Sequence, residues 1–210
     1  MNLVVLGATG RTGRLVVEQA LAAGHTVTAL VRSPQKLTTG HSNLRLVTGE
    51  ATDTLAVSSA LEGADAVISA LGGKGSVIAD STRAIVAAAR KTGLSRVVVL
   101  STFAAERDRL DAGTRLLTGI GMGAMLKDKS AGEEMLRLSD LEWTIVYASI
   151  LSDGPANGSV VVLPEGAKRR MSEKISRADV AAWMVQAATG VQHSRSGVGI
   201  TGSTATRRVA

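Results

Sequence analysis

Three glycines near the N-terminus carry the strongest chemical signal in this chain. Gly7, Gly10 and Gly13 come directly after the apolar run Val4-Val5-Leu6 and lead into an amphipathic stretch. The first glycine permits a tight turn, the second lets the backbone approach a pyrophosphate, and the third lets a helix pack close to a sheet. Since N–H groups at a helix N-terminus attract anions, this segment predicts a site for a dinucleotide diphosphate. A plain glycine turn is the alternative, but the flanking strand and helix favour the dinucleotide site.

The residue that ends the next apolar run indicates which dinucleotide would bind. Arg32 lies about 20 residues past the glycines, where NAD-binding folds place an acid for the ribose 2′-OH and where Arg suits the 2′-phosphate of NADP. No acidic residue lies between Glu18 and Glu50, and Arg11 in the glycine loop can reach toward the same place. Guanidinium groups bind phosphate through paired hydrogen bonds. The pattern therefore favours NADP over NAD. The alternative is that Arg32, like Lys36, is only a solvated charge.

The composition limits the class of protein. Apolar residues make up 45% of the 210 residues and aromatic residues only 2%, so the core must be built from Ala, Val, Leu and Ile, as in buried parallel sheets. We expect one domain over residues 1–210. Scarce aromatics argue against single-stranded nucleic-acid binding, and the lack of cysteine excludes disulfides, thiol catalysis and thiolate metal sites. The histidines show no metal-ligand spacing. With no membrane-length apolar run and no expected signal peptide, we expect a cytoplasmic protein.

The net charge of +6 comes from 24 basic and 18 acidic residues, and some of the basic residues cluster. The clusters are Lys168-Arg169-Arg170 and Arg207-Arg208. Attraction to an anionic cofactor or substrate is one interpretation. Ordinary solvated surface charge is the other, and it is favoured for the C-terminal arginines.

Strand-like and helix-like segments alternate along the chain. The apolar patterns predict strands at 4–6, 25–31, 44–47, 66–71, 96–100, 143–147, 160–163 and 198–201, and helices at 12–23, 53–61, 77–91, 128–138 and 176–189. The glycine-containing segment 103–127 is expected to be a mobile loop or lid with a short helix. This alternation predicts an α/β fold, a doubly wound parallel sheet (Rossmann fold), with a small C-terminal substrate lobe. Ligands of such sheets bind at the carboxyl ends of the strands.

The motif Gly7-Ala8-Thr9-Gly10-Arg11-Thr12-Gly13, followed by Val31-Arg32 and by the segment 64–72, resembles the atypical short-chain dehydrogenases with an NAD(P)H-binding domain. Within them, the chain is most similar to the flavin reductase and biliverdin-IXβ reductase group and to NmrA-like proteins. The resemblance extends over nearly the whole chain, including 139–146. It implies a sheet ordered 3-2-1-4-5-6-7.

The resemblance also implies which residues would contact NADP(H). It assigns the pyrophosphate to Thr9, Gly10, Arg11, Thr12 and Gly13, the 2′-phosphate to Arg32 with Arg11, the adenine to Glu50 and Ala51, the ribose to Ala70, Leu71 and Gly72, and the nicotinamide to Ser101 and Thr102. Two positions depart from the family pattern. Glu50 stands where many relatives have Asp, which would lengthen or remove the adenine contact. Tyr147-Ala148 stands where many have Arg-Pro, which would change the shape of the substrate pocket.

The residues for proton transfer are unusual. Typical short-chain dehydrogenases use a Tyr-x-x-x-Lys pair, but Tyr147 is the only tyrosine and position 151 is Leu. Lys127 and Lys129 could orient a ligand, although a solvated helix start is the favoured interpretation. Ser101 is the candidate catalytic residue: it could orient the carboxamide or relay a proton, or simply bond the backbone at the strand end.

Two functions are compatible with these residues. The first is an NADPH-dependent reductase that transfers hydride to a flavin (FMN or FAD as substrate), a bilin or a quinone-like acceptor, a reaction that needs no strong protein acid. The second is a non-catalytic NADP(H)-sensing regulator of the NmrA-like kind. An isomerase or epimerase is the least favoured, because the tyrosine of a Tyr-x-x-x-Lys pair is missing. Small molecules are the expected partners, and the chain is expected to be a monomer or a weak homodimer.

Overall fold

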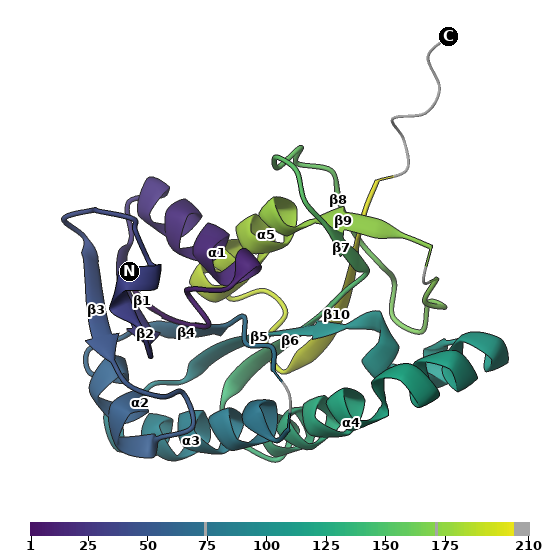
Figure 1. Ribbon diagram of the computed structural model, residues 1–210, viewed down its shortest axis with the longest axis horizontal. Helices are drawn as coiled ribbons and strands as arrows, with labels where there is room; N and C mark the ends of the chain where they lie inside the picture. The colour runs from purple at the N-terminus through teal and green to yellow at the C-terminus, as the bar shows by residue number, and fades with distance from the viewer. Residues whose placement is uncertain (74, 171, 204–210) are drawn as a thin grey trace, which may run out of the picture.

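A computed structural model describes residues 1–73, 75–170 and 172–203 (Figure 1). Its centre is an eight-stranded sheet in the order β3-β2-β1-β4-β5-β6-β10-β8, in which only the edge strand β8 runs antiparallel to its neighbour. The strands are β1 (Asn2–Leu6), β2 (Thr26–Val31), β3 (Leu44–Thr48), β4 (Ala66–Ser69), β5 (Arg96–Thr102), β6 (Glu142–Ala148), β8 (Val160–Val162) and β10 (Ser196–Gly202). The predicted Rossmann fold and its 3-2-1-4-5-6-7 order are confirmed, with β10 in seventh place.

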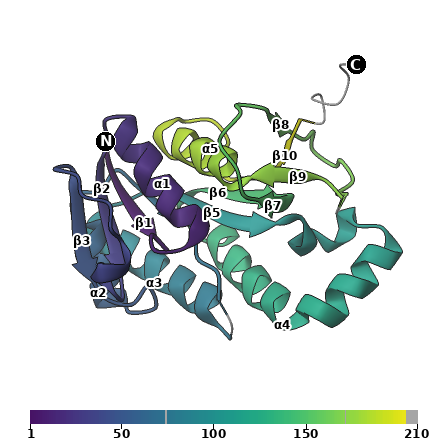
Figure 2. The same ribbon diagram turned by 45° about the horizontal axis from the view of Figure 1, so that its top comes forward.

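Helices cover both faces of the sheet (Figures 1 and 2). One face carries α1 (Arg11–Ala22) and α5 (Arg177–Thr189), and the other carries α2 (Thr54–Leu61), α3 (Val77–Thr92) and α4 (Ala112–Arg137). Successive side chains of a strand point to opposite faces. Leu3 and Val5 of β1 therefore pack with α1 and α5, whereas Val4 and Leu6 pack with α2 and α3.

Side chains fix the ends of several helices. Ser176 Oγ accepts a hydrogen bond from the N–H of Asp179 at 2.9 Å and so caps the start of α5. The carboxylate of Asp128, on α4, accepts from the N–H groups of Ile78 and Ala79, each at 2.9 Å. This carboxylate satisfies two of the free donors at the start of α3 and ties the two helices together.

The prediction of a mobile loop or lid at 103–127 is wrong. Two short 3-10 turns, Phe103–Ala105 and Arg107–Arg109, lead into α4, which runs without a break for 26 residues. Asp111 begins the helix by accepting from the N–H of Thr114 at 2.9 Å. The glycines inside the first half of α4 lower its helix propensity, which hid the helix in the sequence pattern.

Two short strands were not predicted. β7 (Ile150–Ser152) and β9 (Lys174–Ser176) pair in parallel as a separate two-stranded sheet in the region expected to form the substrate lobe. In the part of the chain that the structure describes, no helix combines the length and the apolar character needed to cross a membrane. The arginines at 207 and 208 lie outside the described residues.

Candidate dinucleotide-binding site

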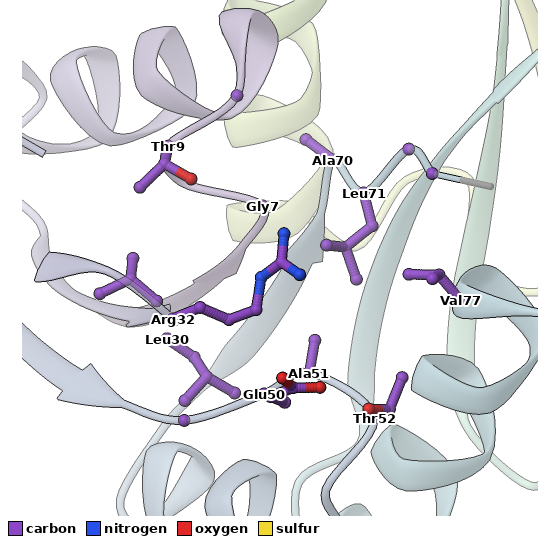
Figure 3. Close-up of a pocket in the computed structure, with 15 residues that line it drawn as sticks. Gly7, Thr9, Leu30, Arg32, Glu50, Ala51, Thr52, Ala70, Leu71 and Val77 are labelled. Carbon is purple, nitrogen blue, oxygen red and sulfur yellow. The ribbon is translucent and has the colours of Figure 1, made fainter. Parts of the chain in front are cut away.

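A cleft opens at the carboxyl ends of the central strands (Figure 3). Its volume is about 450 Å³, and it collects residues from the turns after β1, β2, β3 and β4. Nine of the residues expected to contact a cofactor line it: Gly7, Thr9, Gly10, Arg32, Glu50, Ala51, Ala70, Leu71 and Gly72. Residues that the sequence did not single out, Thr52 and Val77 among them, complete the wall.

The glycine loop is packed too tightly for side chains. Gly7 has a φ of 81°, and its carbonyl accepts from the N–H of Gly10 at 2.9 Å. A Cβ on Gly13 would lie 2.1 Å from the Gly7 carbonyl oxygen. Gly10, which precedes α1, has no side chain to cap the first N–H groups of the helix. These donors therefore remain available for an anion at the mouth of the cleft.

Arg32 and Glu50 bring charge to the cleft. The Arg32 side chain starts at the end of β2 and extends into the cleft, which Glu50 also lines (Figure 3). Both residues are exposed. Arg32 makes no hydrogen bond or ion pair with any described residue. Its guanidinium is thus free to bind a phosphate.

Arg11 points elsewhere. Its guanidinium forms an ion pair with Asp153, and the same carboxylate accepts from Arg177 at 2.7 Å. Arg11 does not line the cleft, so the expected pairing of Arg11 with Arg32 is absent from this structure. Thr12 and Gly13 are buried at the start of α1 and also do not line the cleft.

A family model described as NAD(P)H-binding matches residues 7–190. The chain belongs to the NAD(P)H-binding family. It is 31% identical to 4-hydroxy-tetrahydrodipicolinate reductase of Natronomonas pharaonis over 78% of the chain. The chain spans 63% of that curated relative's length and 64% of a second one's.

Solved structures share the fold over almost the whole chain. ChuY, an anaerobillin reductase of Escherichia coli O157:H7, superposes with a TM-score of 0.82 at 22% identity, covering 100% of both chains. A short-chain dehydrogenase/reductase of Veillonella parvula in complex with NADP gives a TM-score of 0.81 at 20% identity, covering 99% of this chain and 96% of that one. At these identities the likeness establishes the Rossmann fold of this family member.

In this NAD(P)H-binding chain, a buried polar cluster lies beside the cleft at the end of β5. Ser101 Oγ donates to Glu133 Oε1 at 2.6 Å. Glu133 Oε2 accepts from the Tyr147 hydroxyl at 2.6 Å and from Arg137 at 3.1 Å, and Arg137 also donates to the Tyr147 oxygen. The Ser101 hydroxyl therefore faces α4, and neither Ser101 nor Thr102 lines the cleft. Thr102 Oγ1 instead accepts from the N–H of Ala104.

Glu133 and Arg137 are the two residues of this cluster that were not predicted from the sequence. The available signal was the four-residue spacing of Lys129, Glu133 and Arg137, which places all three on one face of α4. The prediction that Lys129 lies at a solvated helix start is wrong. Its side chain is buried and its Nζ donates to the Leu100 carbonyl at 3.1 Å. Burial lowers the pKa of Lys129, and this effect outweighs the negative charges of Glu133 and Asp128, which act to raise it.

Tyr147 stays a neutral phenol over a wide pH range. Burial raises the pKa of Tyr147 above its ordinary value, and the negative charge of Glu133 and the hydrogen bond to it act in the same direction. The group can hold a proton at neutral pH but does not release it easily. This favours a structural hydrogen bond over the phenolate chemistry of a Tyr-x-x-x-Lys pair.

Substituting Tyr147→Phe is expected to lower the free energy of unfolding at pH 8 by about 1.5–3 kcal/mol, because the buried Glu133 loses a hydrogen-bond donor. The raised folded-state pKa also makes the hydroxyl's contribution pH-dependent. It is fully present below the unfolded pKa of about 10 and is lost as the pH rises above that value. Urea unfolding at pH 8 and at pH 10.5 measures both effects. Wild type should lose more stability than the variant between these pH values, and equal losses would contradict the assignment.

Proposed function

We propose that this protein is an NADPH-dependent reductase that transfers hydride to a flavin, a bilin or a quinone-like acceptor. The observation that carries the proposal is the free Arg32 guanidinium in a cleft that begins at a glycine loop. The family match supports a nicotinamide cofactor. The Natronomonas relative and ChuY are both reductases, which supports the same class of activity.

The residues present fit NADP(H). Backbone N–H groups of Thr9, Arg11, Thr12 and Gly13 would hold the diphosphate, because Gly10 has no side chain to cap the start of α1. The Gly10 N–H itself donates to the Gly7 carbonyl and keeps the loop in shape. Arg32 would bind the 2′-phosphate. Glu50 and Ala51 would lie beside the adenine, and Ala70, Leu71 and Gly72 along the ribose. When bound, NADPH supplies the hydride.

Ser101 and Thr102 are assigned to the nicotinamide end in this proposal, because they end β5 at the same edge of the sheet. Ser101 remains the candidate catalytic residue. It holds a proton on Oγ that is shared with Glu133, which is in turn bonded to Tyr147. Ser101 would position the carboxamide or pass its proton by rotation of the hydroxyl. Arg11 would contribute to phosphate binding only after leaving Asp153.

The alternative is a non-catalytic NADP(H) sensor. The specific observation in its favour is that the hydroxyls of Ser101 and Tyr147 both donate to Glu133. Neither residue lines the cleft. A sensor needs the cleft and Arg32 but no proton donor. In either case the partner is a small molecule, and the protein would act as a monomer or a weak homodimer in the cytoplasm.

The decisive experiment is NADPH oxidation, followed by absorbance, with FMN, FAD, biliverdin and a quinone as separate acceptors. The reductase proposal expects steady oxidation with at least one acceptor and a much lower rate with NADH. Tight NADPH binding without oxidation by any of the acceptors would favour the sensor. No binding of either nucleotide would reject both functions.

A further inference from the structure

A second cavity is lined by residues of β6, β8 and β10, at the end of the sheet away from β3. Its volume is about 500 Å³, and it shares no lining residue with the cleft. We call it the arginine groove, because Arg109, Arg137, Arg169 and Arg195 line it. Val162 and Leu163 form the side next to β8. The groove shares Arg137 and Tyr147 with the buried cluster around Glu133, but none of the residues proposed to contact NADP(H) lines it.

The floor of the arginine groove is a face of β10 that carries glycines in place of side chains. Gly197 and Gly199 are two apart on β10 and point to one face, while Val198 and Ile200 pack into the core with α5. A Cβ on Gly197 would lie 2.8 Å from the Tyr147 ring, and one on Gly199 would lie 2.6 Å from the Arg169 guanidinium carbon. The two glycines therefore make room for an aromatic ring and a guanidinium over the sheet.

Arg169 is the most unusual residue of the groove. It is only 3% exposed, its guanidinium carbon lies 5.2 Å from the centre of the Phe103 ring, and its Nε forms an ion pair with Glu106. Its Nη1 is buried without a hydrogen-bond partner among the described residues. A buried charged donor without a partner costs free energy. This cost is recovered if a ligand supplies the acceptor.

The positive charge of the groove exceeds its buried negative charge. Arg109 shares the Glu106 carboxylate with Arg169, at 3.1 Å, and its own Nη1 is likewise buried without a partner among the described residues. Arg195 donates only to the Ser139 carbonyl, at 2.9 Å, and has no carboxylate partner in the described chain. Of the two acids that line the groove, Glu165 is exposed at its rim.

We propose that the arginine groove binds a small anion that carries carboxylate or phosphate groups, at a site separate from the dinucleotide cleft. Guanidinium groups recognise both oxyanions through paired N–H···O bonds. Arg109 and Arg169 each carry a buried Nη1 without a partner among the described residues, and Arg195 adds a third guanidinium to the lining. The cluster Lys168-Arg169-Arg170, which the sequence left open between ligand binding and surface charge, contributes Arg169 to this lining.

The test uses citrate and inorganic phosphate as probes in calorimetric titrations of the full chain at low ionic strength, where charge interactions are least screened. Glycerol serves as the uncharged control. We expect at least one of the two anions to bind at concentrations up to about 10 mM. Citrate binding alone would identify a carboxylate site, and phosphate binding alone a phosphate site. No binding of either anion would overturn the proposal.

Variants of the groove and of the cleft show at which of the two sites the anion binds. The double variant Arg109→Gln/Arg195→Gln should weaken binding by about tenfold or more, the usual effect of losing charged hydrogen bonds. It leaves the Arg169–Glu106 pair intact, and its melting temperature reports on folding. Arg90→Gln is the matched control, since Arg90 is exposed on α3 and outside the groove. Arg32→Asp removes anion binding in the cleft. Probe binding that is lost in Arg32→Asp but kept in the double variant would overturn the proposal.

Discussion

Replacing Arg32 with Asp is expected to lower NADPH affinity by roughly 100-fold or more and to leave NADH affinity unchanged or improved. The free guanidinium in the cleft would be lost, and a second carboxylate would join Glu50 beside the 2′-phosphate. Loss of a charged hydrogen bond and the added repulsion each cost roughly 1.5–3 kcal/mol or more. Since NADH carries a 2′-OH in place of the phosphate, the new Asp can accept a hydrogen bond from it.

Titration of protein fluorescence with each nucleotide measures the two affinities. Lys36→Asp is the matched control: it makes the same charge change nearby, but Lys36 is exposed and outside the cleft. Arg32→Ala separates lost attraction from added repulsion and should fall between wild type and Arg32→Asp. Because Arg32 is exposed, the difference should shrink as salt is added. Equal losses for NADPH and NADH would show that Arg32 does not contact the 2′-phosphate.

The sheet could be predicted because its signals are local. Apolar runs such as Val4-Val5-Leu6 alternate with helical patterns, and each unit ends on residues that mark a turn. The order of the parallel strands followed from the family resemblance and is confirmed. Most of the cleft lining could also be predicted from local patterns, because these residues lie in the turns that immediately follow the apolar runs.

The side-chain partners of Arg11 and Ser101 in this structure lie far away in sequence, so they could not be predicted. Arg11 was expected at the phosphate, but it pairs with Asp153, 142 positions away. Ser101 was expected to face the cofactor, but it donates to Glu133 on α4, 32 positions later. No local pattern encodes either pairing. Such partners are fixed only when the helices have packed on the sheet.

The first half of the helix at 112–137 was not predicted, for a different reason. Its glycines argue for a loop by propensity alone, which is a weak guide where tertiary packing decides. The second half of α4 packs directly on α3: a Cβ on Gly132 would lie 2.9 Å from Thr82 Oγ1. At this position the glycine permits close helix packing, so a residue that weakens an isolated helix stabilises the fold.

The second large effect is expected for Gly13→Ala. The added Cβ would lie 2.1 Å from the carbonyl oxygen and 2.7 Å from the carbonyl carbon of Gly7. Both atoms belong to the backbone, so no flexible side chain can yield, and either the glycine loop or the start of α1 must move. Such overpacking costs typically 1–3 kcal/mol, and this contact is at the upper end or beyond. We expect about 3 kcal/mol loss of unfolding free energy and a fall in NADPH affinity of roughly 100-fold.

Urea unfolding and NADPH titration of the same variant separate folding from binding. Gly40→Ala is the control, because a Cβ there meets nothing within 4 Å, and it should be nearly neutral in both measurements. Gly10→Ala, whose Cβ would lie 3.2 Å from the same Gly7 oxygen, should be intermediate in stability. A Gly13→Ala protein as stable as Gly40→Ala would show that the loop yields to the methyl group. If the Gly13→Ala protein also bound NADPH as tightly as wild type does, diphosphate binding would not depend on the close approach of α1 to β1.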